Sequence, residues 1–134
     1  ETLIGRHPVN RQKMAVVERN GKEAITLYEV LNRGRYNNRA VALLKVNILT
    51  GRTHQIRVHL SHLGNPVLGD AVYGGSRGTG AGRQMLHAWK LRIPHPVSGK
   101  LMEFTAELAE DMQRVLAETE PAITLPEQPK VVEV

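Results

Sequence analysis

Residues that could do chemistry gather in one short stretch of the chain. Residues 49–69 read LTGRTHQIRVHLSHLGNPVLG, and the eleven residues from Arg52 to His62 include two arginines and three histidines. Arginine suits carboxylates and phosphates because its planar guanidinium donates several hydrogen bonds in a fixed fork. The stretch therefore indicates a binding site for an anionic ligand.

The pattern around these residues predicts a strand, a tight turn and a helix. Residues 40–49 (AVALLKVNIL) predict a buried strand, and residues 53–63 predict a helix with Thr53 as its N-cap. Gly64 stands where a glycine would end the helix, and Pro66 would keep it from continuing. The free N–H groups of the first turn would lie beside the arginines, which favours phosphate or another anion.

Helical spacing sorts the side chains of this predicted helix. Ile56, Leu60 and Leu63 recur at i, i+4 and i+7, so we expect them to form the buried stripe. Arg57 falls at the border of that stripe. An arginine in this position either pairs with a carboxylate in a partly buried place or faces a cleft, and the spacing leaves both open.

The charge of the chain is unevenly distributed. The net charge is +5, but residues 1–102 carry 16 Lys/Arg against 5 Asp/Glu, and residues 103–134 carry 2 against 8. A basic body followed by an acidic segment is typical of proteins that bind a polyanion such as nucleic acid. The chain has only one Trp, one Phe and three Tyr, which argues against a stacking platform for single strands.

Length and composition limit the class of protein. A chain of 134 residues predicts one domain. The absence of cysteine excludes disulfides and thiolate metal sites, and it fits the reducing cytoplasm, where we expect the protein to be. No apolar run approaches the length of a membrane span and no signal peptide is recognisable, so we expect no membrane partner.

The remaining segments predict an α+β fold. We expect strands at 3–4, 14–17, 23–31, 84–94 and 101–106, and a helix over 107–118. The strand at 23–31 would pair with 40–49 as an antiparallel hairpin across a polar turn at 31–39. Residues 74–83, with five glycines, predict a mobile loop, and residues 121–134 predict a flexible tail.

The chain shows no complete set of catalytic groups. No carboxylate lies between Glu29 and Asp70 and no HExxH pattern is present, so His54, His59 and His62 predict no metal site. Asp70 could be a nucleophile or a general base, but an Asp in a Gly-Asp turn more often braces the backbone. A metal-free RNA hydrolase that uses His54 and His59 remains a possible function. We infer that part of the site lies outside this chain.

A longer stretch, LTGRTHQIRVHLSHLGNPVLGDAVYG, resembles a signature of the RNA pseudouridine synthases that act through an R-L-D catalytic element. Two flanking segments, GRHPVNRQKMAV at 5–16 and MLHAWKLRIPHPVSGK at 85–100, are also similar to family segments. The GRHP segment is most similar to the branch that modifies large-subunit ribosomal RNA. The resemblance covers residues 3–118.

The resemblance implies an isomerisation of uridine to pseudouridine in structured RNA, with the base flipped out of its helix. It implies no metal or organic cofactor. It also implies a mixed, mostly antiparallel sheet with packed helices, of which residues 1–120 would be the C-terminal part. In the family the catalytic aspartate and a base-packing tyrosine lie upstream of the GRHP segment, and neither is among these 134 residues. We therefore expect this chain alone to be inactive.

The resemblance also implies roles for individual residues. Arg57 matches the arginine that pairs with the catalytic aspartate, so we expect it to lack its carboxylate here, while Asp70 would be structural. Leu86 matches a residue of the substrate pocket. The expected RNA contacts come from the central unit and from the basic loop near the N-terminus: Arg52, Thr53, His54, Gln55, Arg11 and Lys13.

Two kinds of partner follow from this reading. One is RNA, most simply ribosomal RNA. The other is the N-terminal part of the same enzyme, because we expect this chain by itself to expose an uncovered sheet edge or apolar face. The alternative function is that of a non-catalytic RNA-binding module.

Overall fold

The structure is a computed structural model that describes residues 1–74, 79–125 and 132–133. The chain divides into two compact units, residues 1–85 and residues 86–134. Each unit is described by itself. Helices together with antiparallel sheets place the described part of the chain in the α+β class, as predicted. The assignment of residues 1–120 to one domain stays a prediction.

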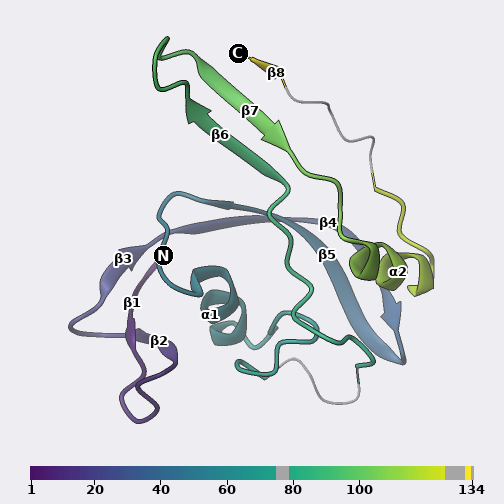
Figure 1. Cartoon of the computed structure of the whole chain (residues 1–134). Helices are drawn as coiled ribbons and strands as arrows, with labels where there is room; N and C mark the ends of the chain where they lie inside the picture. The colour runs from purple at the N-terminus through teal and green to yellow at the C-terminus, as the bar shows by residue number, and fades with distance from the viewer. Residues whose placement is uncertain (75–78, 126–131, 134) are drawn as a thin grey trace. The chain divides into compact units, whose positions relative to one another are not determined.

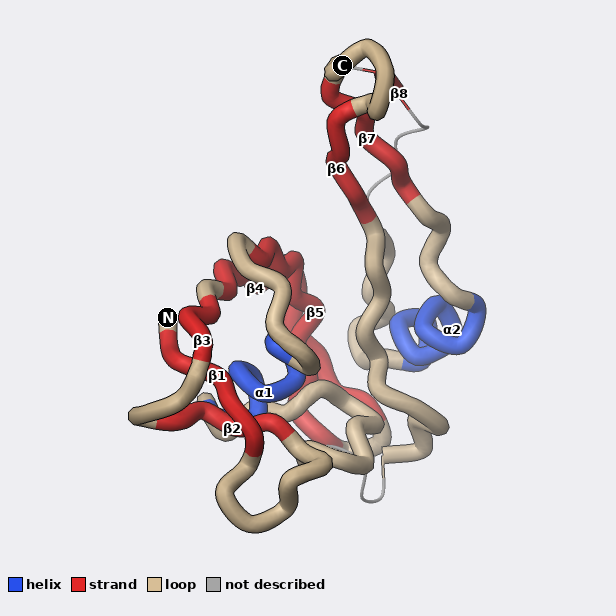
Figure 2. The backbone as a smooth tube through the Cα atoms, turned by 60° about the vertical axis from the view of Figure 1, so that its left-hand side comes forward, coloured by secondary structure: helices blue, strands red, loops and turns tan. Residues whose placement is uncertain are grey.

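The first unit begins with a small antiparallel sheet. Its central strand β1 (Thr2–Arg6) pairs with β2 (Met14–Val17) on one side and with β3 (Lys22–Ala24) on the other. Figure 2 shows this sheet beside the helix α1. The core joins Ile4 and Ala24 of the sheet to Val58 and Tyr73, which come from much later in the chain. The sheet and the central stretch of the sequence therefore share one core.

A long curved hairpin follows, in which β4 (Thr26–Tyr36) pairs with β5 (Arg39–Ile48) (Figure 1). The predicted hairpin is confirmed, but the predicted polar turn at 31–39 is wrong. The strands continue to Tyr36 and Arg39, and only Asn37 and Asn38 turn, with φ of 47° and 63°. Asparagine tolerates this left-handed conformation, which a two-residue hairpin turn of type I′ requires.

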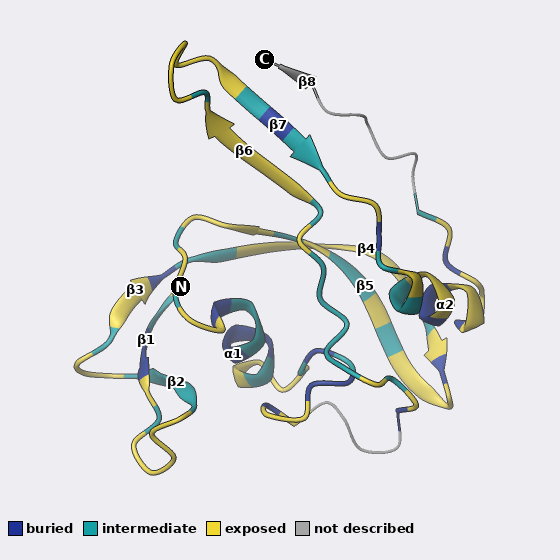
Figure 3. Cartoon of the chain, viewed as in Figure 1, coloured by how far each residue is buried: buried dark blue, intermediate teal, exposed yellow. Residues whose placement is uncertain are grey.

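The hairpin is more exposed than the sequence predicts. Residues 40–49 are half-buried or exposed rather than a buried strand, as the colouring of β5 in Figure 3 shows. On the hairpin, Leu27, Tyr28 and Ile48 are 51%, 53% and 48% exposed. The expected uncovered apolar surface is therefore present within the described residues.

The helix α1 (Gln55–His62) begins two residues later than predicted. Its N-cap position is His54, in the left-handed conformation and with no capping bond, so Thr53 is not the cap. The C-terminal end is as predicted: Gly64 has φ of 84°, and the N–H groups of Gly64 and Asn65 donate to the carbonyls of Ser61 and Leu60. This pair of bonds is the Schellman arrangement that glycine permits.

The buried face of α1 differs from the predicted stripe. The buried residues are Gln55, Val58, His59 and Leu60. Leu63 is 56% exposed and Ile56 is half-buried. The apolar spacing failed because two polar side chains occupy the buried face, where they find hydrogen-bond partners.

His59 joins α1 to two strands that are distant in sequence. Its Nε2 lies 2.7 Å from Oγ1 of Thr2 on β1, and its Nδ1 lies 2.6 Å from Oγ1 of Thr26 on β4. Gln55 adds to this contact, because its Nε2 donates to Oγ1 of Thr26 and to the carbonyl of Ile25. Burial, then the charges of the amino terminus and His62, lower the pKa of His59, which favours the neutral ring. These bonds fix the position of α1.

The second unit contains a hairpin and a helix. β6 (Lys90–Pro94) pairs with β7 (Leu101–Thr105), β7 also pairs with β8 (Val132–Glu133), and α2 spans Glu110–Glu118. The hairpin and helix are those predicted, although β6 covers only the end of the predicted strand and α2 starts three residues later than predicted. Leu108, Val115, Leu116 and Ile123 are buried around α2.

The structure describes only parts of the two segments that were predicted to be mobile or flexible. In the glycine-rich loop, residues 75–78 lie outside the described residues, whereas Thr79 is 1% exposed and its carbonyl accepts a bond from Asn37. In the tail, residues 126–131 and 134 lie outside them, whereas Ile123 is buried and its N–H donates to Leu116. The described ends of both segments are anchored.

Replacing His59 by alanine should destabilise the first unit by about 2–3 kcal/mol. The half-buried hydroxyl of Thr2 loses its imidazole partner, that of Thr26 keeps only the bond from Gln55, and a cavity forms. His62→Ala, on the exposed face of the same helix, should cost less than about 0.5 kcal/mol. Urea denaturation of the two variants measures the difference. Equal stability of the two would contradict the bracing role of His59.

Candidate functional site

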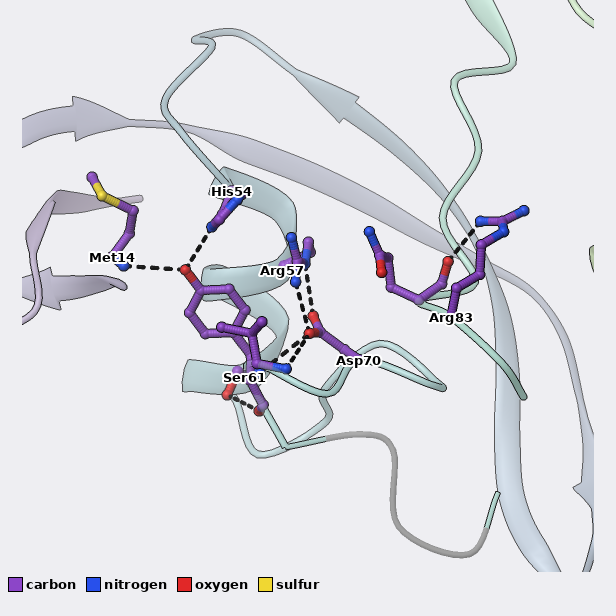
Figure 4. A network of polar contacts seen from close by, with 9 residues as sticks. Met14, His54, Arg57, Ser61, Asp70 and Arg83 are labelled. Carbon is purple, nitrogen blue, oxygen red and sulfur yellow. Dashed lines mark hydrogen bonds and ion pairs between the residues drawn. The ribbon is translucent and has the colours of Figure 1, made fainter. Parts of the chain in front are cut away.

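The centre of the first unit is an ion pair between Arg57 and Asp70 (Figure 4). Nε of Arg57 donates to Oδ2 of Asp70 over 2.8 Å, and Nη2 donates to Oδ1 over 2.9 Å. The side chains are 12% and 0% exposed. Arg57 therefore has a carboxylate partner within this chain, and the expectation that it lacks one is wrong. Of the two readings that the spacing left open, the structure contains the partly buried ion pair.

The loop that follows α1 holds the carboxylate of Asp70 in place. Oδ1 of Asp70 also accepts the N–H groups of Val72 and Tyr73, at 3.1 Å and 3.2 Å. Such bonds are the bracing expected of an Asp in a tight turn. The hydroxyl of Ser61 on α1 donates to the carbonyl of Tyr73 over 2.8 Å. Helix and loop are thus tied together on both sides of the ion pair.

Gly69 lets a later segment approach this loop. It has φ of 81°, and a Cβ at this position would lie 2.0 Å from the carbonyl oxygen of Arg83. The N–H of Met85 donates to the carbonyl of Leu68 over 2.8 Å. Only glycine allows both this backbone conformation and this approach. The backbone at Arg83 and Met85 therefore packs against the loop that carries Asp70.

The ion pair keeps both partners charged. Burial by itself would raise the pKa of Asp70, but hydrogen bonds from Arg57 and from the N–H groups of Tyr73 and Val72 outweigh it and lower that pKa. The hydrogen bond to Asp70 raises the pKa of Arg57. Because each charge has a partner, the pair tolerates an environment that would neutralise an isolated carboxylate.

The guanidinium of Arg57 is only half used. Asp70 binds the edge formed by Nε and Nη2, and no hydrogen bond reaches Nη1 from the part of the chain that the structure describes. A guanidinium has five N–H donors, so its second edge, Nη1 with Nη2, can still bind a carboxylate or a phosphate through two bonds. The guanidinium of Arg57 can therefore bind a second anion while Asp70 fixes its position.

Tyr73 forms a platform beside the ion pair. Its hydroxyl accepts the N–H of Met14 at 3.1 Å and lies 2.8 Å from Nδ1 of His54. Nζ of Lys13 lies 5.3 Å and Cζ of Arg57 5.1 Å from the centre of its ring. Sequence reasoning missed this residue, although a single tyrosine three positions after the Asp of a tight turn was a usable signal.

His54 belongs to the same platform. Its ring meets that of Tyr73 edge to face, with the ring centroids 5.6 Å apart. Burial and the charge of Arg57 lower the pKa of His54 against the opposing effect of Asp70. The structure thus gathers three of the predicted site residues, Lys13, His54 and Arg57, around one aromatic ring.

The other predicted site residues lie in different settings. Arg52 donates from Nε to the carbonyl of Glu23 over 2.7 Å, Thr53 is exposed, and Arg11 is exposed on the loop between β1 and β2. Gln55 is 3% exposed and its amide bonds are made within the chain, so its predicted RNA contact is replaced by a structural role. Leu86 is the first residue of the second unit and half-buried, and its place in a substrate pocket stays a prediction.

The buried position of His59 weakens the hydrolase alternative. Both ring nitrogens of His59 are bonded to threonine hydroxyls, and the residue is 8% exposed. The predicted buried stripe of Ile56, Leu60 and Leu63 did not include this residue. A hydrolase that uses His54 and His59 together would need the second histidine to reach RNA, and this packing prevents it.

The described residues contain neither a cluster of metal ligands nor a membrane-spanning helix. They include no group of three or more His, Cys, Asp or Glu side chains arranged to hold a metal ion. Nor do they include a helix that is long and apolar enough to cross a membrane.

Asp70→Asn should lower the free energy of unfolding at pH 7 by about 3 kcal/mol, because it leaves a largely buried arginine unpaired. The folded-state pKa of Asp70 lies below its ordinary value of 3.8, so its contribution is present above that pH and is lost as the pH falls through the folded pKa. The gap between variant and wild type should therefore narrow in acid. Urea denaturation across a pH series, with Glu29→Gln as an exposed control, tests this. A constant gap would contradict it.

Comparisons with known proteins match the same region. The model of a family described as RNA pseudouridylate synthase matches residues 2–62. A protein of Chloroflexus aurantiacus named "Uncharacterized RNA pseudouridine synthase" is 51% identical over 115 residues, which cover 84% of this chain and 34% of that protein. "Ribosomal large subunit pseudouridine synthase D" of Nitrosomonas europaea is 45% identical over 121 residues, with 84% and 34% covered.

A solved structure agrees with the sequence relatives. "Human RNA Pseudouridylate Synthase Domain Containing 1" has a TM-score of 0.69 and 37% identity, and the match covers 79% of this chain and 46% of that one. The chain spans about a third of the length of the curated relatives that it matches. By sequence and by fold, the chain is similar to RNA pseudouridine synthases over most of its length.

Proposed function

We propose that this chain forms part of an enzyme that isomerises uridine to pseudouridine in RNA, with large-subunit ribosomal RNA as its substrate. In this proposal Arg57 binds the catalytic aspartate, which comes from a segment outside these 134 residues. The observation that carries the proposal is the half-used guanidinium of Arg57. Asp70 fixes one edge of it, and the other edge suits a second carboxylate. The names of the Nitrosomonas europaea and Escherichia coli relatives support the choice of ribosomal RNA.

The role of Arg57 in the reaction is electrostatic. A positive charge within hydrogen-bond distance favours the ionised form of a carboxyl group and lowers its pKa. The catalytic aspartate would therefore be held as a carboxylate and in a fixed direction. The isomerisation breaks the bond between N1 of uracil and the ribose, turns the base, and joins C5 to the same ribose carbon. The proton on C5 is lost and N1 gains a proton, so the composition of the nucleoside is unchanged. A carboxylate held in a fixed position beside the ribose lowers the barrier to these steps more than a mobile carboxylate does.

The RNA contacts in this proposal lie on the same unit as Arg57. Lys13 and His54 lie beside Tyr73. Arg52 is half-buried and Thr53 is exposed just before α1, and Arg11 is exposed on the loop between β1 and β2. We assign the cationic side chains among them to phosphate oxygens, which supply much of the affinity for nucleic acids. Leu86 would line the uracil pocket. We also propose that the enzyme is cytoplasmic.

The chain alone fits a second, narrower function. The R-L-D element expected from the family resemblance is not among these 134 residues. With the cationic residues present and that element absent, the chain by itself would bind RNA without modifying it.

A chimera separates the two. We expect an enzyme in which this chain replaces the matched third of the Nitrosomonas europaea relative to form pseudouridine in large-subunit ribosomal RNA, whereas the chain alone forms none. Arg57→Lys in the chimera should lower kcat by roughly a hundredfold, because lysine cannot bind two carboxylates in fixed directions. The matched control, Arg33→Lys on the exposed strand β4, should keep kcat within about threefold.

Mass spectrometry of nucleosides from the treated RNA measures the product. Pseudouridine formed by the chain alone, or full activity of the Arg57→Lys chimera, would contradict the proposed role of Arg57. A folded chimera without activity, beside an active parent relative, would contradict the proposed function.

A further inference from the structure

The tips of two hairpins are built in the same way. The connection between β1 and β2 contains His7-Pro8-Val9-Asn10, and the connection between β6 and β7 contains His95-Pro96-Val97-Ser98. We call these two segments the HPV tips. They belong to different units of the chain.

The histidine closes the turn in both HPV tips. Nδ1 of His7 accepts the N–H groups of Val9 and Asn10 at 3.1 Å and 3.0 Å. Nδ1 of His95 accepts the N–H groups of Val97 and Ser98 at 3.1 Å and 3.2 Å. The imidazole acts as the acceptor that a backbone carbonyl supplies in an ordinary turn, and it can do so only when Nδ1 carries no proton.

Backbone bonds stiffen both tips further. In the first, the N–H of His7 donates to Lys13 and the N–H of Lys13 donates to Asn10. In the second, the N–H of His95 donates to Lys100 over 2.7 Å and that of Gly99 donates to His95 over 2.9 Å. Proline restricts the backbone before the valine as well. Because the tips are already ordered, little conformational entropy would be lost when they bind.

The valine at each tip points into solvent. Val9 is 85% and Val97 is 90% exposed, more than any other large apolar side chain in the described residues. Neither valine contributes burial to the fold of this chain. A single exposed apolar side chain is common on protein surfaces, so the two valines gain meaning from the rigid turn that holds each of them and from the charges beside it.

The positive charge around both tips favours an anionic partner. Residues 2–17 contain Arg6, Arg11 and Lys13 and no acidic residue, and residues 86–102 contain Lys90, Arg92 and Lys100 and no acidic residue. In the second hairpin, Arg92 and Lys90 contact Glu103 further from the tip. A valine side chain surrounded by Lys and Arg side chains is complementary to a polyanion that also has exposed apolar surfaces. Nucleic acid bases beside their phosphates have that chemistry.

We propose that the two HPV tips are RNA contacts, in which Val9 and Val97 pack against unstacked bases while the neighbouring cations bind phosphates. The proposal rests on the proposed function, since it takes RNA as the ligand. Apolar side chains of other nucleic-acid-binding proteins are inserted against bases in this way. The tips add apolar contacts with bases to the cationic site around Arg57.

Salt dependence tells the two kinds of contact apart. A cation that binds a phosphate contributes to the slope of affinity against salt, whereas an apolar contact does not. The experiment titrates the 134-residue chain into a fluorescein-labelled RNA hairpin with an unpaired uridine bulge, at several KCl concentrations. A fully paired RNA duplex of equal length serves as the second probe, because it offers no unstacked base.

We expect Val9→Ser and Val97→Ser each to weaken binding to the bulged hairpin by roughly fivefold without a change in salt slope. Arg11→Gln should reduce the slope by about one. Val9→Ile should bind like the wild type, and Leu27→Ser, an exposed apolar residue of β4, should change nothing. Binding to the duplex should be the same for wild type and valine variants. Circular dichroism verifies that each variant is folded.

The outcomes separate this inference from the proposed function. If the wild-type chain bound neither RNA, both would be overturned. If it bound RNA but the serine variants stayed within about twofold of wild type, or lost affinity equally for the duplex, the HPV tips alone would be overturned.

Discussion

The ion pair between Arg57 and Asp70 is the interaction on which the first unit depends. A carboxylate with 0% exposure needs every one of its bonds, and here they come from a helix and from the loop that follows it. That requirement explains the surrounding structure: Ser61 ties the loop to α1, and Gly69 admits the segment around Arg83 behind it. His59 and Gln55 fix the same helix to β1 and β4. The arginine is therefore held at both ends, by its helix and by its carboxylate.

The two edges of the Arg57 guanidinium have different roles: one is bound by Asp70, and the other can bind a second anion. Asp70 orients the guanidinium and is itself inaccessible, so it does not compete for substrate. The remaining edge of Arg57 can then meet a second anion without reorganising, which is where preorganised sites gain their advantage. The side chain of Tyr73 contacts Arg57, Lys13 and His54. The chain thus contributes a prepared cationic surface to a reaction whose carboxylate we assign to another segment.

Local patterns in the sequence predicted the features that depend on neighbouring residues. The Schellman end at Gly64, the pairing of β4 with β5 and the hairpin of β6 with β7 all follow from turn chemistry and alternation. The buried face of α1 did not, because the partners that make a buried His59 acceptable are Thr2 and Thr26, far away along the chain. The partner of Arg57 was missed for a different reason. The spacing allowed a carboxylate, but the family resemblance assigned that carboxylate to a residue outside the chain and left Asp70 only a backbone role.

The direction of the Arg57 guanidinium is therefore set within this chain. Nuclear magnetic resonance of the arginine side chains measures this directly, since a guanidinium held through Nε and Nη2 rotates slowly about its Nε–Cζ bond. We expect the Nε–H of Arg57 to give a sharp, exchange-protected signal in the wild-type chain at neutral pH, and we expect Asp70→Asn to remove it. A signal of Arg57 that is averaged and exchanges like those of exposed arginines in the wild type would contradict the central claim.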